Sequence, residues 1–121
     1  MEGLEVIEIK AFVPAQDYDI SKAFYKDLGF TMAFDGDGIA YFRYGNQSFL
    51  LQDFYERDHA NNFMMHLLVK DVERWYQHIL DSGIVDKYQV KVTEPDDRPW
   101  KMRDFVLFDP SGVLWRIAQN I

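Results

Sequence analysis

Residues 23–30 of the chain read AFYKDLGF. They lie in a segment whose apolar residues recur at helical spacing, namely Ile20, Ala23, Phe24 and Leu28. This periodicity predicts an amphipathic helix whose Phe24 packs against a sheet. We place the N-cap at Asp19 and the end of the helix at Gly29, because Asp is a common N-cap and Gly commonly follows the last turn.

Strand-like segments flank this helix on both sides. Before it, the segment Val6–Val13 alternates, with one face formed by Ile7, Ile9, Ala11 and Val13. After it, three short strands are predicted over residues 30–34, 39–44 and 48–54, separated by turns rich in Gly, Asp and Asn. Residues 56–62 are polar and are interpreted as a connecting loop.

The same order of elements returns in the second half of the chain. Residues 63–69 are strand-like, and Asp71 is the predicted N-cap of a helix that ends at Gly83. Three further strands are predicted over residues 88–92, 102–108 and 113–119. A shift of 54 positions (71 − 17 = 54) aligns Asp17 with Asp71 and Gly29 with Gly83.

This repeat predicts the fold class. Each half has the order strand, helix and three strands, and each is too small to bury its own sheet alone. We therefore expect a single α+β domain over residues 1–121, built of two βαβββ modules at about residues 1–58 and 59–121, which form a curved mixed sheet.

Composition narrows the classes of function. The 121 residues carry 20 acidic and 13 basic side chains and a formal net charge of −7, which disfavours nucleic acid and anionic membranes as partners. There is no cysteine, so disulfides and thiolate metal sites are excluded. The N-terminal residues do not form a signal peptide, and we expect a cytoplasmic protein. Aromatic residues make up 17% of the chain, more than a small core needs, so we expect some of them to line a surface or groove.

Two motifs resemble those of a known superfamily. The FYKDLGF motif at residues 24–30 and the Asp109-Pro110-Ser111-Gly112 turn before Trp115 resemble the vicinal oxygen chelate superfamily. It includes glyoxalase I, extradiol dioxygenases and the bleomycin resistance proteins. With the repeat, the resemblance covers essentially the whole chain and implies the fold above, but the motifs are not specific for one activity.

The metalloenzymes of this superfamily hold one divalent ion on the concave face of the sheet. By the resemblance, three of their usual ligand positions are occupied here by Lys10, Met64 and Arg116. Two cations and a thioether do not form a site for a hard divalent ion. We therefore expect no metal, no other cofactor and no catalysis.

An irregular metal site is the alternative from another class of function. Glu8 and His66 each lie two residues from a usual ligand position and so keep the same strand face, and Gln52 is a conventional ligand. These three residues would serve a metal-dependent lyase, isomerase or dioxygenase. Otherwise Glu8 is expected to pair with Lys10 or Arg116, and Arg116 could instead be neutralised by Asp104.

The likeness is strongest to the bleomycin resistance proteins. These are homodimers that sequester the drug in grooves between the subunits, and a tryptophan at the position of Trp100 stacks on the flat part of the drug. The resemblance thus implies a homodimer with a small-molecule ligand, either a bleomycin-type antibiotic or another partly flat aromatic compound. A binding module for a metabolic or regulatory ligand stays open beside it.

The residues themselves fit a binding groove. Trp100 follows the turn-like stretch 96–99, where a purely structural tryptophan would be unusual. A flat cationic ligand needs aromatic faces and nearby carboxylates. The candidate ligand-binding residues are Trp100, Phe34, Tyr41, Asp53, Lys10, Arg116, Met64 and His66.

Overall fold

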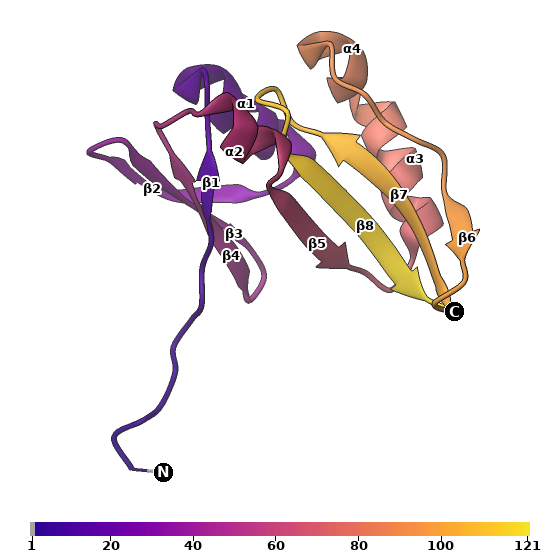
Figure 1. The fold of residues 1–121 in the computed structure, drawn as a ribbon, viewed down its shortest axis with the longest axis horizontal. Coiled ribbons are helices and arrows are strands. Elements are labelled where there is room, and N and C mark those ends of the chain that lie inside the picture. The colour runs from indigo at the N-terminus through magenta and orange to yellow at the C-terminus, as the bar shows by residue number, and fades with distance from the viewer. Residues whose placement is uncertain (1) are drawn as a thin grey trace.

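The computed structural model describes residues 2–121, which form two four-stranded mixed sheets with helices packed on them (Figure 1). The first sheet has the spatial order β1 (Phe12–Pro14), β4 (Gln47–Gln52), β3 (Ile39–Tyr44) and β2 (Thr31–Gly36). The second has the order β5 (Met64–Leu68), β8 (Leu114–Asn120), β7 (Met102–Phe108) and β6 (Asp96–Arg98). The helices are α1 (Tyr18–Leu28), α2 (Arg57–Asn61), α3 (Val72–Ser82) and α4 (Ile84–Tyr88).

The two sheets have the same internal topology. In each, the first strand along the chain pairs parallel with the last, and the other neighbours are antiparallel. This confirms the predicted α+β fold with mixed sheets. Within residues 2–121, no helix has the length and apolar character needed to cross a bilayer.

The N-cap of helix α1 lies two residues earlier than we predicted. Asp17 has extended backbone angles, and its carboxylate accepts a hydrogen bond from the Ile20 backbone N–H at 3.1 Å, so Asp17 is the N-cap. Asp19 lies in the first turn instead, where a carboxylate still interacts favourably with the helix dipole. The predicted end at Gly29 is confirmed, and its φ of 121° is one that glycine adopts without strain.

The predicted strand Val6–Val13 is mostly wrong. Only Phe12–Pro14 forms β1, because only these residues pair with β4. The backbone hydrogen bond nearest the N-terminus joins the Leu50 N–H to the Ala11 carbonyl. Residues 2–11, here called the N-terminal arm, form no strand, and their N-terminal part extends away from the sheets (Figure 1). The alternation that predicted a strand leaves Ile7 and Ile9 each 93% exposed.

Two connections also differ from expectation. The polar residues 56–62, predicted as a loop, contain the short helix α2, whose N-cap Glu56 accepts hydrogen bonds from two backbone N–H groups. The strand predicted over residues 88–92 is reduced to an isolated bridge between Val92 and Leu107. Its first residue, Tyr88, ends the helix α4 instead, where its hydroxyl bonds Asp27 on α1. A short strand, β6, forms further on instead.

The two halves of the chain are joined by a buried polar contact at Tyr25. Its hydroxyl donates to the Asp109 carboxylate at 2.5 Å and accepts from the Trp115 ring N–H at 2.9 Å. Asp109 also accepts the backbone N–H groups of Ser111 and Val113, which shapes the turn between β7 and β8. Burial raises the pKa of Asp109 to about 6, so this carboxyl is mainly ionised at neutral pH.

The substitution Tyr25→Phe should therefore destabilise the whole domain. It leaves the Asp109 oxygen and the Trp115 N–H buried without this partner, which should lower the free energy of unfolding by about 1–3 kcal/mol. Urea denaturation measures the change. Tyr44→Phe, at an exposed tyrosine, is the matched control and should cost far less. Equal losses in the two variants would contradict the central role of the Tyr25 hydroxyl.

Candidate functional site

Each sheet has one face packed into the core and one face that we call its open face. On the first sheet, Phe42, Phe49 and Leu51 point into the core, so the alternate residues of the same strands form the open face: Tyr41, Arg43, Ser48, Leu50 and Gln52. On the second sheet, pairing and burial place on the open face Met64, His66, Leu68, Asp104, Val106, Leu114 and Arg116. Six predicted site residues lie on or over these two faces: Tyr41, Lys10, Gln52, Met64, His66 and Arg116.

The first open face carries a carboxylate held by several donors. Glu8, from the N-terminal arm, accepts hydrogen bonds from the Tyr41 hydroxyl at 2.7 Å and the Ser48 hydroxyl at 2.6 Å. Lys10 and Arg43 lie 3.4 Å and 3.9 Å from its oxygens, which confirms the predicted pairing with Lys10. The hydrogen bonds from Ser48 and Tyr41, followed by Lys10, hold the pKa of Glu8 at about 2.

Tyr41 is consequently more enclosed than its prediction as a groove wall implied. Its hydroxyl also accepts a hydrogen bond from Arg43 at 3.0 Å. The Lys10 ammonium and the Arg43 guanidinium lie 5.0 Å and 5.6 Å from the centre of its ring. The ring is therefore already in contact with two cations of its own chain.

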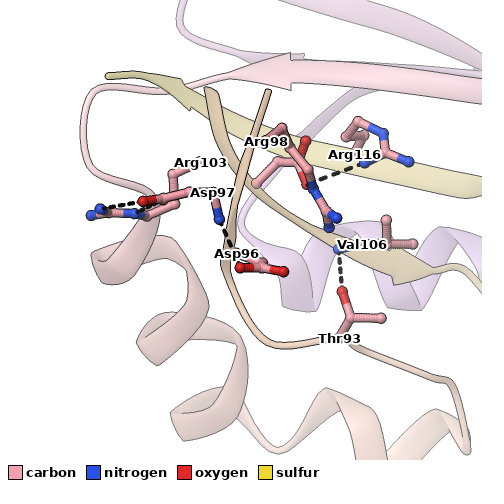
Figure 2. Close-up of polar contacts among 8 residues, drawn as sticks. Thr93, Asp96, Asp97, Arg98, Arg103, Val106 and Arg116 are labelled. Carbon is pink, nitrogen blue, oxygen red and sulfur yellow. Dashed lines mark hydrogen bonds and ion pairs between the residues drawn. The ribbon is translucent and has the colours of Figure 1, made fainter. Parts of the chain in front are cut away.

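The second open face carries a carboxylate between two guanidinium groups. Asp104 is fully buried, and its Oδ1 atom accepts from Arg98 at 2.9 Å and from Arg116 at 3.1 Å. The predicted neutralisation of Arg116 by Asp104 is confirmed, while the sequence did not single out Arg98. Figure 2 shows Arg98 and Arg116 close together, whereas Asp97 pairs with Arg103 elsewhere on the hairpin. Asp104 Oδ2 is buried without a hydrogen-bond partner among residues 2–121.

The predicted aromatic residues Trp100 and Phe34 are both exposed, at 60% and 58%, as a stacking role requires. Trp100 lies in the turn between β6 and β7, whereas Phe34 lies on β2, so one chain presents them on different sheets. Asp53 is exposed at the end of the first sheet, and its backbone N–H donates a hydrogen bond to the Gly38 carbonyl. A single chain thus does not gather all of the predicted residues into one site.

A cleft of about 420 Å³ lies between the two sheets. Its walls come from both halves of the chain and include Ser48 of the first open face and His66 of the second. The side chains of Phe30 and Trp115 also reach it, so the cleft is partly apolar. Residues from both open faces therefore line a common space.

The alternative metal site consists of Glu8, Gln52 and His66. The Glu8 carboxylate is bound to Ser48, and Gln52 lies four residues further along β4, a separation of about 13 Å for an extended strand. His66 lies on β5, opposite Arg116. Residues 2–121 contain no group of three or more His, Cys, Asp and Glu side chains arranged to hold a metal ion.

Comparison with known proteins places the chain in a family. The sequence profile of the Glyoxalase/Bleomycin resistance protein/Dioxygenase superfamily matches residues 8–117, and the chain belongs to this superfamily. A bleomycin resistance protein from Klebsiella pneumoniae is 27% identical over 114 residues, which cover 89% of this chain and 88% of that protein.

Solved structures share the fold at lower sequence identity. A bleomycin-binding protein crystallised with bleomycin has a TM-score of 0.82 and 24% identity, over 96% of this chain and 100% of that one. A lactoylglutathione lyase from Agrobacterium tumefaciens has a TM-score of 0.67 and 18% identity, over 95% of each chain. Binding proteins and enzymes thus share this architecture, so function must be argued from the site.

The substitution Asp104→Asn should destabilise the second sheet. It removes the negative charge between Arg98 and Arg116 at a fully buried position, and the expected loss in unfolding free energy is about 3 kcal/mol. Asp97→Asn is the matched control, because the Asp97–Arg103 pair is exposed and screened by solvent, so its loss should cost far less. Chemical denaturation of both variants measures the difference, and a smaller loss for Asp104→Asn than for Asp97→Asn would contradict it.

Proposed function

We propose that this protein binds and sequesters a bleomycin-type antibiotic, or a similar small aromatic ligand, without transforming it. The groove lies at the interface of a homodimer, where the first open face of one subunit meets the second open face of the other. Its ligand-binding residues are those predicted from the sequence: Trp100, Phe34, Tyr41, Asp53, Lys10, Arg116, Met64 and His66.

The exposed Trp100 carries the proposal. An indole that is 60% exposed at the tip of a hairpin contributes little to the core and presents a broad face for stacking. The Klebsiella pneumoniae relative is named a bleomycin resistance protein, and the similarity to it covers 89% of this chain. Lys10 and Arg116 each face a carboxylate of their own chain, which reduces the repulsion that these cations would exert on a cationic ligand.

The N-terminal arm supports the homodimer. Four of its apolar side chains are 62–93% exposed in the single chain, namely Leu4, Val6, Ile7 and Ile9. Exposed apolar side chains gathered on one short segment are typical of an interaction surface. A second copy would also bring the Phe34 and Trp100 of different chains to a common groove, which the single chain does not do.

Ligand binding can be measured by titrating intrinsic tryptophan fluorescence with metal-free bleomycin after the protein has been treated with a chelator. We expect saturable quenching near one drug per chain. Trp100→Ala should weaken binding by about 1–3 kcal/mol through the lost stacking. Trp75→Phe, on α3 and away from the open faces, is the control and should retain the affinity. A flat titration with the unmodified protein would refute binding of this drug.

The dimer can be tested by sedimentation velocity. Ile9→Asp should raise the dimer dissociation constant by about tenfold or more, because burial of an isoleucine side chain contributes about 1.5–3 kcal/mol. Leu80→Asp, at an exposed apolar residue of α3, is the matched control and should leave the dimer unchanged. A monomeric unmodified protein, or equal behaviour of the two variants, would count against the arm as an interface.

A further inference from the structure

The donors around Glu8 form a cradle with the chemistry of a carboxylate site. We define the cradle as the side chains of Lys10, Tyr41, Arg43 and Ser48. Two hydroxyl groups and two cations converge on one carboxylate. Each hydroxyl donates a hydrogen bond to a different oxygen of that carboxylate. Charge-assisted hydrogen bonds of this kind are the usual means by which proteins recognise carboxylates.

The cradle stays cationic with Glu8 in place. Lys10 and Arg43 contribute two positive charges, and Glu8 supplies one negative charge. The remaining positive charge stands out in a chain whose net charge is −7. The Glu8 side chain is only 22% exposed, so its carboxylate fills the cradle rather than lying on its rim.

The segment that carries Glu8 is weakly attached to the rest of the molecule. The backbone bond nearest the N-terminus that links the arm to a sheet joins Ala11 to Leu50. Among residues 2–121, the hydrogen bonds, ion pairs and cation–π contacts that join residues 2–10 to the body run through the side chains of Glu8 and Lys10. Glu8 can therefore leave the cradle without breaking a strand pairing. Of the donors it leaves, Tyr41, Arg43 and Ser48 belong to β3 and β4, whereas Lys10 lies on the arm itself.

We infer that the cradle is a binding site for the carboxylate of a small molecule, and that Glu8 occupies it as an internal substitute for that ligand. A carboxylate in solution competes with Glu8, whose covalent attachment gives it a high effective concentration. Binding of the external carboxylate displaces Glu8 from the cradle. A ligand of the cradle needs a carboxylate and no aromatic ring, so this inference does not depend on the proposed stacking of a flat ligand on Trp100.

Glu8→Ala empties the cradle and makes the inference testable. The probe is sodium acetate at constant ionic strength, followed by the backbone amide NMR signals of Tyr41, Arg43 and Ser48. We expect saturable shifts in Glu8→Ala, with an affinity at least about tenfold higher than in the unmodified protein, where Glu8 competes. Acetamide, which has the same shape without the charge, should produce no saturable shift.

Matched variants separate the cradle from general effects on the arm. Glu5→Ala removes another carboxylate of the arm and should behave like the unmodified protein, while Arg43→Gln added to Glu8→Ala should abolish the acetate response. Glu8→Ser empties the cradle with a different side chain and should reproduce the result of Glu8→Ala. Absence of saturation in both Glu8 variants, or an equal response in Glu5→Ala, would overturn the inference. Because acetate has no ring, neither outcome bears on the binding of flat ligands, which the fluorescence titration with bleomycin tests separately.

Discussion

The buried hydroxyl of Tyr25 joins the two halves of this protein. Helix α1 belongs to the first half, whereas the Asp109 carboxylate and the Trp115 indole that bond this hydroxyl belong to the second. The Ser21 and Ser111 side chains meet 3.3 Å apart beside it. Because Asp109 also shapes the turn between β7 and β8, the same contact fixes the start of β8 and so the placement of Arg116 on the second open face.

Much of this architecture could be predicted from the sequence because its signals are local. The helical spacing around Phe24, the glycine after each long helix and the repeated order of elements all reflect constraints within a few residues. The errors arose where a distant partner decides the conformation. The alternation in Val6–Val13 has the period of a strand, but β4 pairs with only its end. The segment 88–92 has strand-like composition, but the contacts of α4 with α1 keep Ile84–Tyr88 helical.

The sequence predicted several residues of the candidate site, but fewer of the contacts that these residues make. The exposure of Trp100 followed from the turn-like residues before it, and the pairing of Lys10 with Glu8 from their spacing on one strand face. Arg98 was missed because its role depends on β6, a strand of three residues with no clear sequence pattern. Ser48 and Arg43 could not be assigned either, since their meeting with Glu8 depends on how the arm crosses β3 and β4.

The strand order also bears on how the chain folds. Every strand pairs with a strand of its own half, and none crosses to the other sheet. Each sheet can therefore close over a short stretch of chain, where the entropic cost of loop closure is small. The contacts between α1 and the turn at Asp109 join residues 84 positions apart in the chain, so they form only when both halves are in place. Joining the two halves therefore closes a longer stretch of chain than any strand pairing, the longest of which spans 50 positions (114 − 64), and it carries the larger entropic cost of loop closure.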